Sequence, residues 1–152
     1  ILILHKLLIL KKIFVFISII VFFAIPNFSF FKSNFVKIDK NWLDFNQINL
    51  ANLIDKDNIV FLDVTADWCA TCQYNKINVI DSAMVKEAFK KYKVIKVKAD
   101  WTKPNKKIEN FLFENKKFGI PFNIIYNKNN VDGISFSEIL SSKEILKTLE
   151  SF

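Results

Sequence analysis

Residues 59–76 read IVFLDVTADWCATCQYNK, and this stretch decides the fold. Its first seven residues are apolar or β-branched apart from Asp63, which is typical of a buried central strand. The residues from Cys69 to about Val79 predict a helix directly after that strand. Both cysteines of the chain, Cys69 and Cys72, stand three positions apart where the strand gives way to the helix. The stretch therefore predicts one unit of an α/β domain and raises the question of what its two thiols do.

The rest of the chain continues the alternation of strands and helices. Pro104 suits the first turn of a helix that runs to Gly119 and places Phe118 on its apolar side. Ser82 and either Ser141 or Ser142 are suited to cap two other helices. The expected strands are 35–38, 59–65, 93–100, 120–126 and 131–136, and the expected helices are 45–54, 69–79, 83–92, 106–118 (with Pro104 in its first turn) and 143–152. A crossover half followed by a hairpin half predicts an α/β fold around a mixed sheet.

The first thirty-one residues form a separate unit. Residues 13–25 carry no charge and only Ser18 is polar, and continuing to residue 31 gives a segment long enough to span a bilayer. We expect a retained signal-anchor or a transmembrane helix; the first residue is not Met, which is compatible with a piece of a longer protein. Lys6, Lys11 and Lys12 favour a cytoplasmic N-terminus, which would place the remainder outside the inner membrane in an oxidising compartment. The predicted organisation is 1–31 membrane segment, 32–58 linker and first elements of the domain, and 59–152 α/β domain.

Composition and charge exclude several classes of protein. Of the 152 residues, 51% are hydrophobic, which is too many for a disordered chain. The formal net charge is +7, but the lysines are spread along the sequence and form no stripe with interleaved aromatic residues. We therefore expect no nucleic-acid partner.

The spacing of the cysteines leaves four interpretations, which are a redox pair, half of a metal site, a structural staple or chance. A zinc site needs about four ligands, whereas the chain has no third cysteine and its single histidine, His5, lies in the membrane segment. A disulfide across so short a loop removes little entropy from the unfolded chain. No metal and no other cofactor is expected, and chance spacing stays open on the two cysteines alone.

The surrounding residues favour a redox pair. At the start of a helix, Cys69 would lie beside free N–H groups that lower its thiol pKa, so that it acts as the nucleophile, while the more buried Cys72 would resolve the mixed disulfide. Asp63, near the end of the strand, would be partly buried with a raised pKa and would shuttle the proton of Cys72. Trp68 either offers a contact surface or packs in the core. Ile120–Pro121 is well placed for a cis peptide bond that sets a backbone edge beside the sulfurs, suited to binding a substrate strand.

Taken together, these motifs resemble the thioredoxin superfamily and, more narrowly, the C-terminal periplasmic domain of DsbD, the thiol:disulfide interchange protein. The resemblance covers residues 59–152, and its most specific motifs are VTADWC and ADWT followed by FGIP. It implies a thioredoxin-like fold and a membrane-anchored protein-disulfide reductase in the bacterial inner membrane, with its domain facing the periplasm. It also implies an electron-donating membrane domain or protein, and disulfide-containing substrates such as isomerases and cytochrome c maturation factors. Carried over by position, Cys69 and Cys72 are the redox pair, Asp63 tunes them and Pro121 is the cis-proline.

Two positions depart from the pattern that the resemblance implies. Members commonly carry Lys after the second cysteine and an acid a few residues later, where this chain has Gln73 and Lys76. Because a nearby cation favours a thiolate, we expect Cys69 to be more acidic than is usual for the family. Two alternatives stay open. A dithiol oxidase would carry every one of these residues. A thioredoxin-fold binding or adaptor module with inert cysteines would not be an enzyme.

Overall fold

The computed structural model describes residues 11–15 and 42–152. The chain divides into two compact units, Ile1–Lys40 and Asn41–Phe152. Within the described residues, no helix is both long enough and apolar enough to cross a membrane. The membrane segment expected at 1–31 and the strand expected at 35–38 fall largely or wholly outside this part of the chain.

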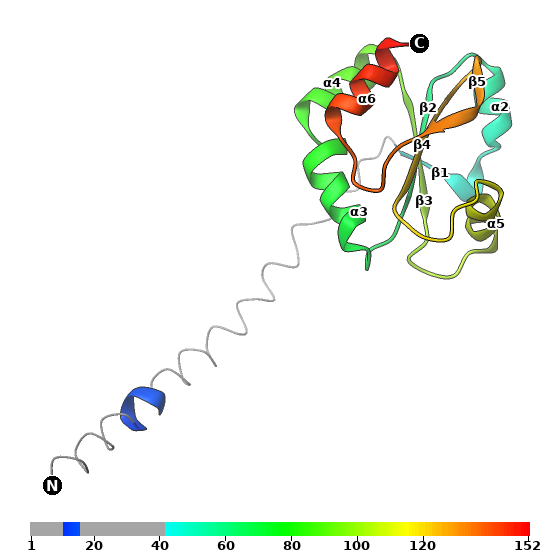
Figure 1. Cartoon of the computed structure of the whole chain (residues 1–152). Helices are drawn as coiled ribbons and strands as arrows, with labels where there is room; N and C mark the ends of the chain where they lie inside the picture. The colour runs from blue at the N-terminus through cyan, green and yellow to red at the C-terminus, as the bar shows by residue number, and fades with distance from the viewer. Residues whose placement is uncertain (1–10, 16–41) are drawn as a thin grey trace, which may run out of the picture. The chain divides into compact units, whose positions relative to one another are not determined.

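The second unit is a five-stranded mixed sheet with helices on both faces (Figure 1). The strand order is β1-β3-β2-β4-β5, in which β1, β3 and β2 are parallel, and β4 and β5 are antiparallel to their neighbours. Figure 1 shows α3, α4 and α6 on one face and α2 and α5 on the other. In chain order the elements are β1 Trp42–Asp44, η2 Phe45–Gln47, α2 Leu50–Asp55, β2 Val60–Thr65, α3 Ala70–Asn75, η3 Lys76–Ile80, α4 Ala83–Lys91, β3 Ile95–Asp100, α5 Lys106–Glu114, β4 Phe122–Asn127, β5 Asn130–Ser135 and α6 Ser142–Glu150. The predicted α/β fold with a mixed sheet is confirmed.

Strand β2 is the centre of the domain, with β3 on one side and β4 on the other. Successive side chains of a strand point to opposite faces. Val60, Leu62 and Val64 accordingly pack in the core beneath α2 and α5, while Phe61 packs in the core beneath α4 and α6. Because both faces of the strand are covered, its sequence is almost continuously apolar.

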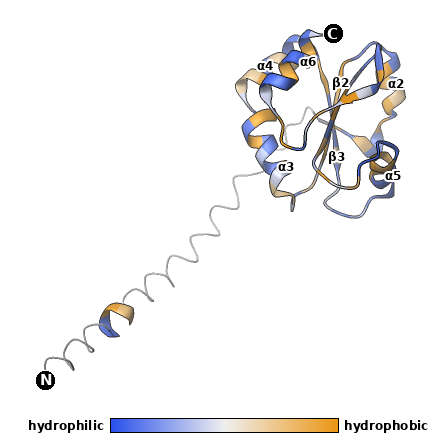
Figure 2. Ribbon diagram, in the orientation of Figure 1, coloured by the Kyte–Doolittle hydropathy of each residue, from blue (hydrophilic) through white to orange (hydrophobic). Residues whose placement is uncertain are grey.

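The helices cover these cores with one apolar side each, and α4, α5 and α6 carry both hydrophobic and hydrophilic residues (Figure 2). The Ser82 hydroxyl accepts a hydrogen bond from the Val85 amide and starts α4, as the sequence predicts. Ser141 occupies the corresponding place before α6 without a side-chain cap hydrogen bond. The helix after Cys69 continues past α3 as the π-helical turn η3, which extends to Ile80.

The helix expected after Pro104 is shorter than predicted. Its first turn is capped by Asn105, so Pro104 precedes the helix instead of forming its first turn. It ends at Glu114, and Lys116 then adopts a positive φ of 56° that turns the chain away. Phe118 therefore does not join the apolar side of the helix and is 86% exposed.

The region before β2 also differs from the prediction. The single helix expected at 45–54 is two pieces, η2 and α2, because the side chains of Asp44 and Asn49 each cap a separate start. The first described strand is Trp42–Asp44, which the sequence pattern did not indicate. Its three residues pair with β3 at the sheet edge.

Candidate functional site

The two cysteines form a disulfide at the N-terminal end of α3. Their sulfur atoms are 2.08 Å apart, and Cys69 is the N-cap residue of the helix. The backbone N–H of Cys72 donates a hydrogen bond of 3.2 Å to Cys69 Sγ. Cys69 is 7% exposed and Cys72 3% exposed. Cys69 thus lies at the start of the helix and Cys72 is the more buried of the two, as predicted.

Trp68 lies on the surface beside the disulfide. Its side chain is 63% exposed, so of its two interpretations core packing is wrong. The indole Nε1 donates to the backbone oxygen of Thr102 at 3.3 Å, and the backbone N–H of Asp67 donates to Thr102 Oγ1 at 3.0 Å. The loop before Cys69 is thus tied to the loop that follows β3.

Asp100 holds Thr102 in place at the end of β3. Its carboxylate accepts hydrogen bonds from the backbone N–H and the hydroxyl of Thr102 and from Lys98 Nζ. Partial burial works against the charged form, but the hydrogen bonds from Lys98 and Thr102 outweigh it and lower the pKa of Asp100. Thr102 is a site residue that was not predicted from the sequence, although it is the last residue of the ADWT motif.

Asp63 is the buried acid of the site. It is 7% exposed, and its Oδ1 accepts a hydrogen bond of 2.8 Å from Asn123 Nδ2. Burial raises the pKa of Asp63 to about 6, against the hydrogen bond from Asn123 and the positive charges of Lys98 and Lys76, all of which lower it. The expected raised pKa is present, and the burial is more complete than predicted. Its role in moving the proton of Cys72 stays a prediction.

Ile120 and Pro121 lie directly before β4, and the peptide bond between them is cis, as expected from the sequence. Pro121 is buried, and Ile120 packs against the cluster formed by Ala66, Cys69 and Cys72. The segments at 66–72 and at 120–121, some fifty residues apart in the sequence, therefore meet at the disulfide. Substrate binding by Trp68, Ile120 and Pro121 stays a prediction.

Gln73 and Lys76, the two positions that depart from the expected family pattern, interact with different residues of the site. Gln73 Nε2 donates a hydrogen bond of 3.3 Å to the backbone oxygen of Ala66, which fastens the loop ahead of Cys69. Lys76, half-buried in η3, acts electrostatically on Asp63. The effect expected of Lys76 from the sequence was on Cys69, and its effect on Asp63 was not predicted.

Asn123 is a second residue that the sequence analysis missed. It is 1% exposed on β4 and stands directly opposite Asp63 in the β2–β4 pairing. No local pattern marks it, because the contact joins residues sixty positions apart.

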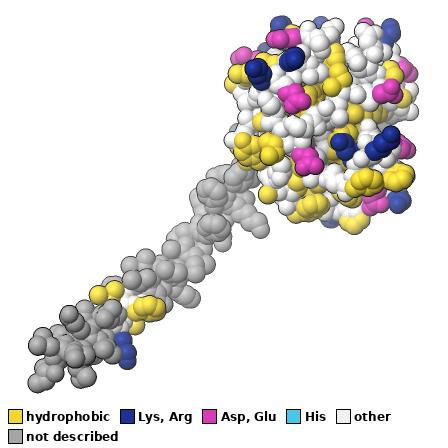
Figure 3. Space-filling view, viewed as in Figure 1, with side chains coloured by type: hydrophobic (Ala, Val, Ile, Leu, Met, Phe, Trp, Pro, Cys, Tyr) yellow, Lys and Arg dark blue, Asp and Glu magenta, His cyan; other side chains and the backbone are white. Residues whose placement is uncertain are grey.

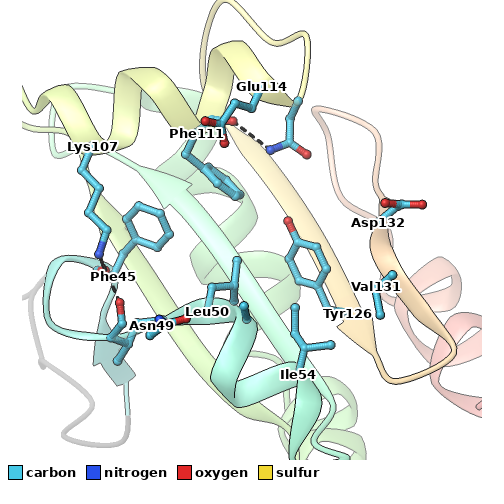
Figure 4. Close-up of a pocket in the computed structure, with 13 residues that line it drawn as sticks. Phe45, Asn49, Leu50, Ile54, Lys107, Phe111, Glu114, Tyr126, Val131 and Asp132 are labelled. Carbon is cyan, nitrogen blue, oxygen red and sulfur yellow. Dashed lines mark hydrogen bonds between the residues drawn. The ribbon is translucent and has the colours of Figure 1, made fainter.

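A pocket of about 600 Å³ lies on the face of the sheet that α2 and α5 cover, between these helices and the β4–β5 hairpin (Figure 4). The aromatic rings of Phe45, Phe111 and Tyr126 line it, and burial raises the pKa of Tyr126 above its ordinary value. None of the predicted site residues lines this pocket. Across the part of the chain that the structure describes, no three His, Cys, Asp or Glu side chains are grouped to hold a metal ion.

Comparison with known proteins agrees with this geometry. A family model described as thioredoxin-like matches residues 41–128. The chain belongs to the thioredoxin-like family. No curated protein matches its sequence.

Solved structures with the thioredoxin-like fold include DsbD domains. The C-terminal domain of Neisseria meningitidis DsbD in the reduced form is 20% identical over 66% of this chain and 86% of that one, with a TM-score of 0.52. The oxidised form is 18% identical over 66% and 87%, with a TM-score of 0.54. A thioredoxin from Thermus thermophilus is 14% identical over 73% and 85%, with a TM-score of 0.56. At these identities the likeness shows the fold, and the CxxC pair is of the kind that thioredoxin-fold thiol-disulfide oxidoreductases carry.

Proposed function

We propose that the protein is a membrane-anchored, periplasm-facing protein-disulfide reductase of the DsbD C-terminal type. The observation that carries the proposal is the disulfide at the start of α3, placed against Ile120 within a domain whose central strand buries an acid with a raised pKa. A titrating group near neutrality is suited to accept and return a proton during exchange.

The proposed reaction begins from the reduced dithiol. The Cys69 thiolate attacks one sulfur of a substrate disulfide, forms a mixed disulfide and releases the other substrate sulfur as a thiolate. The Cys72 thiol gives its proton to the Asp63 carboxylate, and the resulting thiolate attacks Cys69 Sγ. The second substrate thiolate leaves and the Cys69–Cys72 disulfide forms, so that two electrons have passed to the substrate. The released thiolates take protons from solvent and from Asp63.

The geometry supports the division of labour between the sulfurs. The Cys72 N–H that donates to Cys69 Sγ would stabilise a negative charge on that atom in the reduced protein. Cys72 is the more buried of the two and is placed to attack only a sulfur already held at Cys69. We propose that the exposed Trp68, next to Cys69 in the chain, and Ile120, which packs against the cysteines, offer apolar contact surface to a substrate.

We further propose that electrons reach the disulfide from a dithiol of a membrane protein or membrane domain. The apolar segment before residue 32 would hold the domain at the lipid surface near that donor. The substrates would be periplasmic disulfide-containing proteins such as isomerases and cytochrome c maturation factors. The charges do not favour a nucleic-acid partner, since Lys and Asp or Glu side chains are interspersed on the face shown in Figure 3.

Single-cysteine variants test this function. Cys69→Ser should abolish reduction of a protein disulfide by the dithiol form, whereas Cys72→Ser should accumulate a mixed disulfide visible by mass spectrometry. Full activity in Cys69→Ser would overturn the proposal. An equilibrium with glutathione separates reductase from oxidase, because a reductase has a potential near that of thioredoxin and an oxidase a much higher one. A reduced Cys69 that fails to react with a thiol reagent at neutral pH would instead indicate an adaptor.

A further inference from the structure

Asn123 is buried, and its side chain donates a hydrogen bond to the Asp63 carboxylate. Its Nδ2 donates to Asp63 Oδ1 at 2.8 Å, across the pairing of β4 with β2. Its own Oδ1 is buried and has no hydrogen-bond partner, and it is the one buried side-chain nitrogen or oxygen atom so identified within residues 11–15 and 42–152. The side-chain amide therefore donates a hydrogen bond through Nδ2, while its oxygen accepts none.

Apart from the hydrogen bond to Asp63, no contact in the described part of the chain favours an amide at position 123. A buried amide oxygen without a partner costs stability, and an apolar β-branched residue would be better suited to a covered central strand. Asn75 shows what a structural buried amide looks like in the same domain. It is also 1% exposed, but its Nδ2 donates to the backbone oxygen of Glu138 at 2.7 Å and its Oδ1 accepts from the backbone N–H of Leu140 at 3.0 Å. Asn75 joins two segments, whereas Asn123 contributes a hydrogen bond to the Asp63 carboxylate.

We propose that Asn123 is a positioning residue for the thiol-disulfide reaction, which holds the Asp63 carboxylate in its ionised form so that it can accept the proton of Cys72. The inference rests on the proposed function. A hydrogen bond from a neutral donor to a charged carboxylate is stronger than one between neutral groups, so the amide favours the charged state.

The other groups that affect the ionisation of Asp63 act through their charges, whereas Asn123 acts through a hydrogen bond. Lys98 on β3 and Lys76 on η3 favour the charged carboxylate, while Asp100 on β3 opposes it. Lys98 is shared, because its Nζ also lies 2.7 Å from Asp100 Oδ2. The amide is the one hydrogen-bond donor recorded for the Asp63 carboxylate within the described part of the chain. When it is removed, burial is opposed by the two lysines alone.

The step that Asn123 supports is a proton transfer. The Cys72 S–H bond breaks, its electron pair stays on sulfur, and the proton passes to a carboxylate oxygen of Asp63. No electrons change centres until the new thiolate attacks Cys69 Sγ. If Asp63 is already protonated, this acceptor is lost and resolution of the mixed disulfide slows.

The test is a titration of the Asp63 carboxyl carbon by NMR in the full-length oxidised protein, with Asn123→Val compared with the wild type. The pKa of Asp63 should rise by about one unit or more, which is at least a tenfold change in the ratio of its ionised to its neutral form. Asn75→Ala is the matched control, since it removes an equally buried amide with no hydrogen bond to the acid and should leave the titration in place. An unchanged or lowered pKa of Asp63 in Asn123→Val would overturn the inference.

A second measurement on the wild type guards against a variant that fails to fold. The Asn123 side-chain N–H resonances should move with the titration of Asp63, and those of Asn75 should not. Resonances of Asn123 that ignore this titration would also overturn the inference. Neither readout requires turnover, so a wild-type protein that reduces no disulfide would refute the proposed function separately. In the active protein, Asn123→Val should slow release of the mixed disulfide at neutral pH and recover as the pH is raised.

Discussion

Replacing Asp63 by Asn should stabilise the folded protein at neutral and alkaline pH. The pKa of Asp63 is about 6 in the folded protein against 3.8 for an unperturbed group, so folding favours its neutral form. A difference of about two pKa units corresponds to about 3 kcal/mol. This penalty on the folded state is complete above about pH 6 and absent below about pH 3.8, because between these values the folded state binds more protons than the unfolded state.

An amide at position 63 carries no charge to bury, and it retains a carbonyl oxygen to accept from Asn123 Nδ2. Its own N–H group can in turn donate to Asn123 Oδ1, which has no partner in the wild type. Asp63→Asn should therefore raise the free energy of unfolding by up to about 3 kcal/mol at high pH and by little at low pH.

The assay is denaturant unfolding of the oxidised full-length protein at about pH 8 and at about pH 3.5, on either side of the window set by the two pKa values. Asp67→Asn is the control, because it removes the same charge from an exposed position four residues away. A stability gain of Asp63→Asn that is equal at both pH values, or a loss at high pH, would refute the attribution of the raised pKa to burial.

Three further substitutions test other contacts. Lys76→Glu reverses a charge near the site and should raise the pKa of Cys69, read from the pH dependence of its alkylation; a faster reaction at low pH would contradict this. Thr102→Val removes the hydroxyl that accepts from the loop before Cys69, so it should cost about 1 kcal/mol and alter the fluorescence of Trp68, and an unaltered spectrum would count against that tie. Gly133→Ala should destabilise the domain by roughly 1–3 kcal/mol, because its φ is 76° and an added Cβ would lie 2.6 Å from side-chain atoms on β4; thermal unfolding unchanged from wild type would refute this clash.

Local patterns predicted most of the fold. The apolar run of β2, the Ser82 cap and the cysteines at the start of α3 each depend on neighbouring residues, and each appears where expected. The cis bond expected at Ile120–Pro121, where a proline opens a strand, is also present, and Ile120 packs against the two cysteines.

What the sequence could not predict depends on distant contacts and on competing caps. The three-residue strand Trp42–Asp44 is defined by its pairing with β3, since so short a segment has no period of its own. The helix expected at 45–54 divides because Asn49 caps a second start within it. Asn123 and Thr102 enter the site through contacts with residues sixty and about thirty-five positions away.

The central place of β2 has a consequence for how the site can vary. The backbone of Asp63 is paired to Lys98 on one side and to Asn123 on the other, so its position is fixed by two ladders of hydrogen bonds. Both partners also present side chains that act on its charge. A substitution at either neighbour can therefore reset the acidity of the site while the sulfurs, the loop and the sheet stay in place. Related chains can acquire different exchange rates through flanking strands alone, with the CxxC segment unaltered.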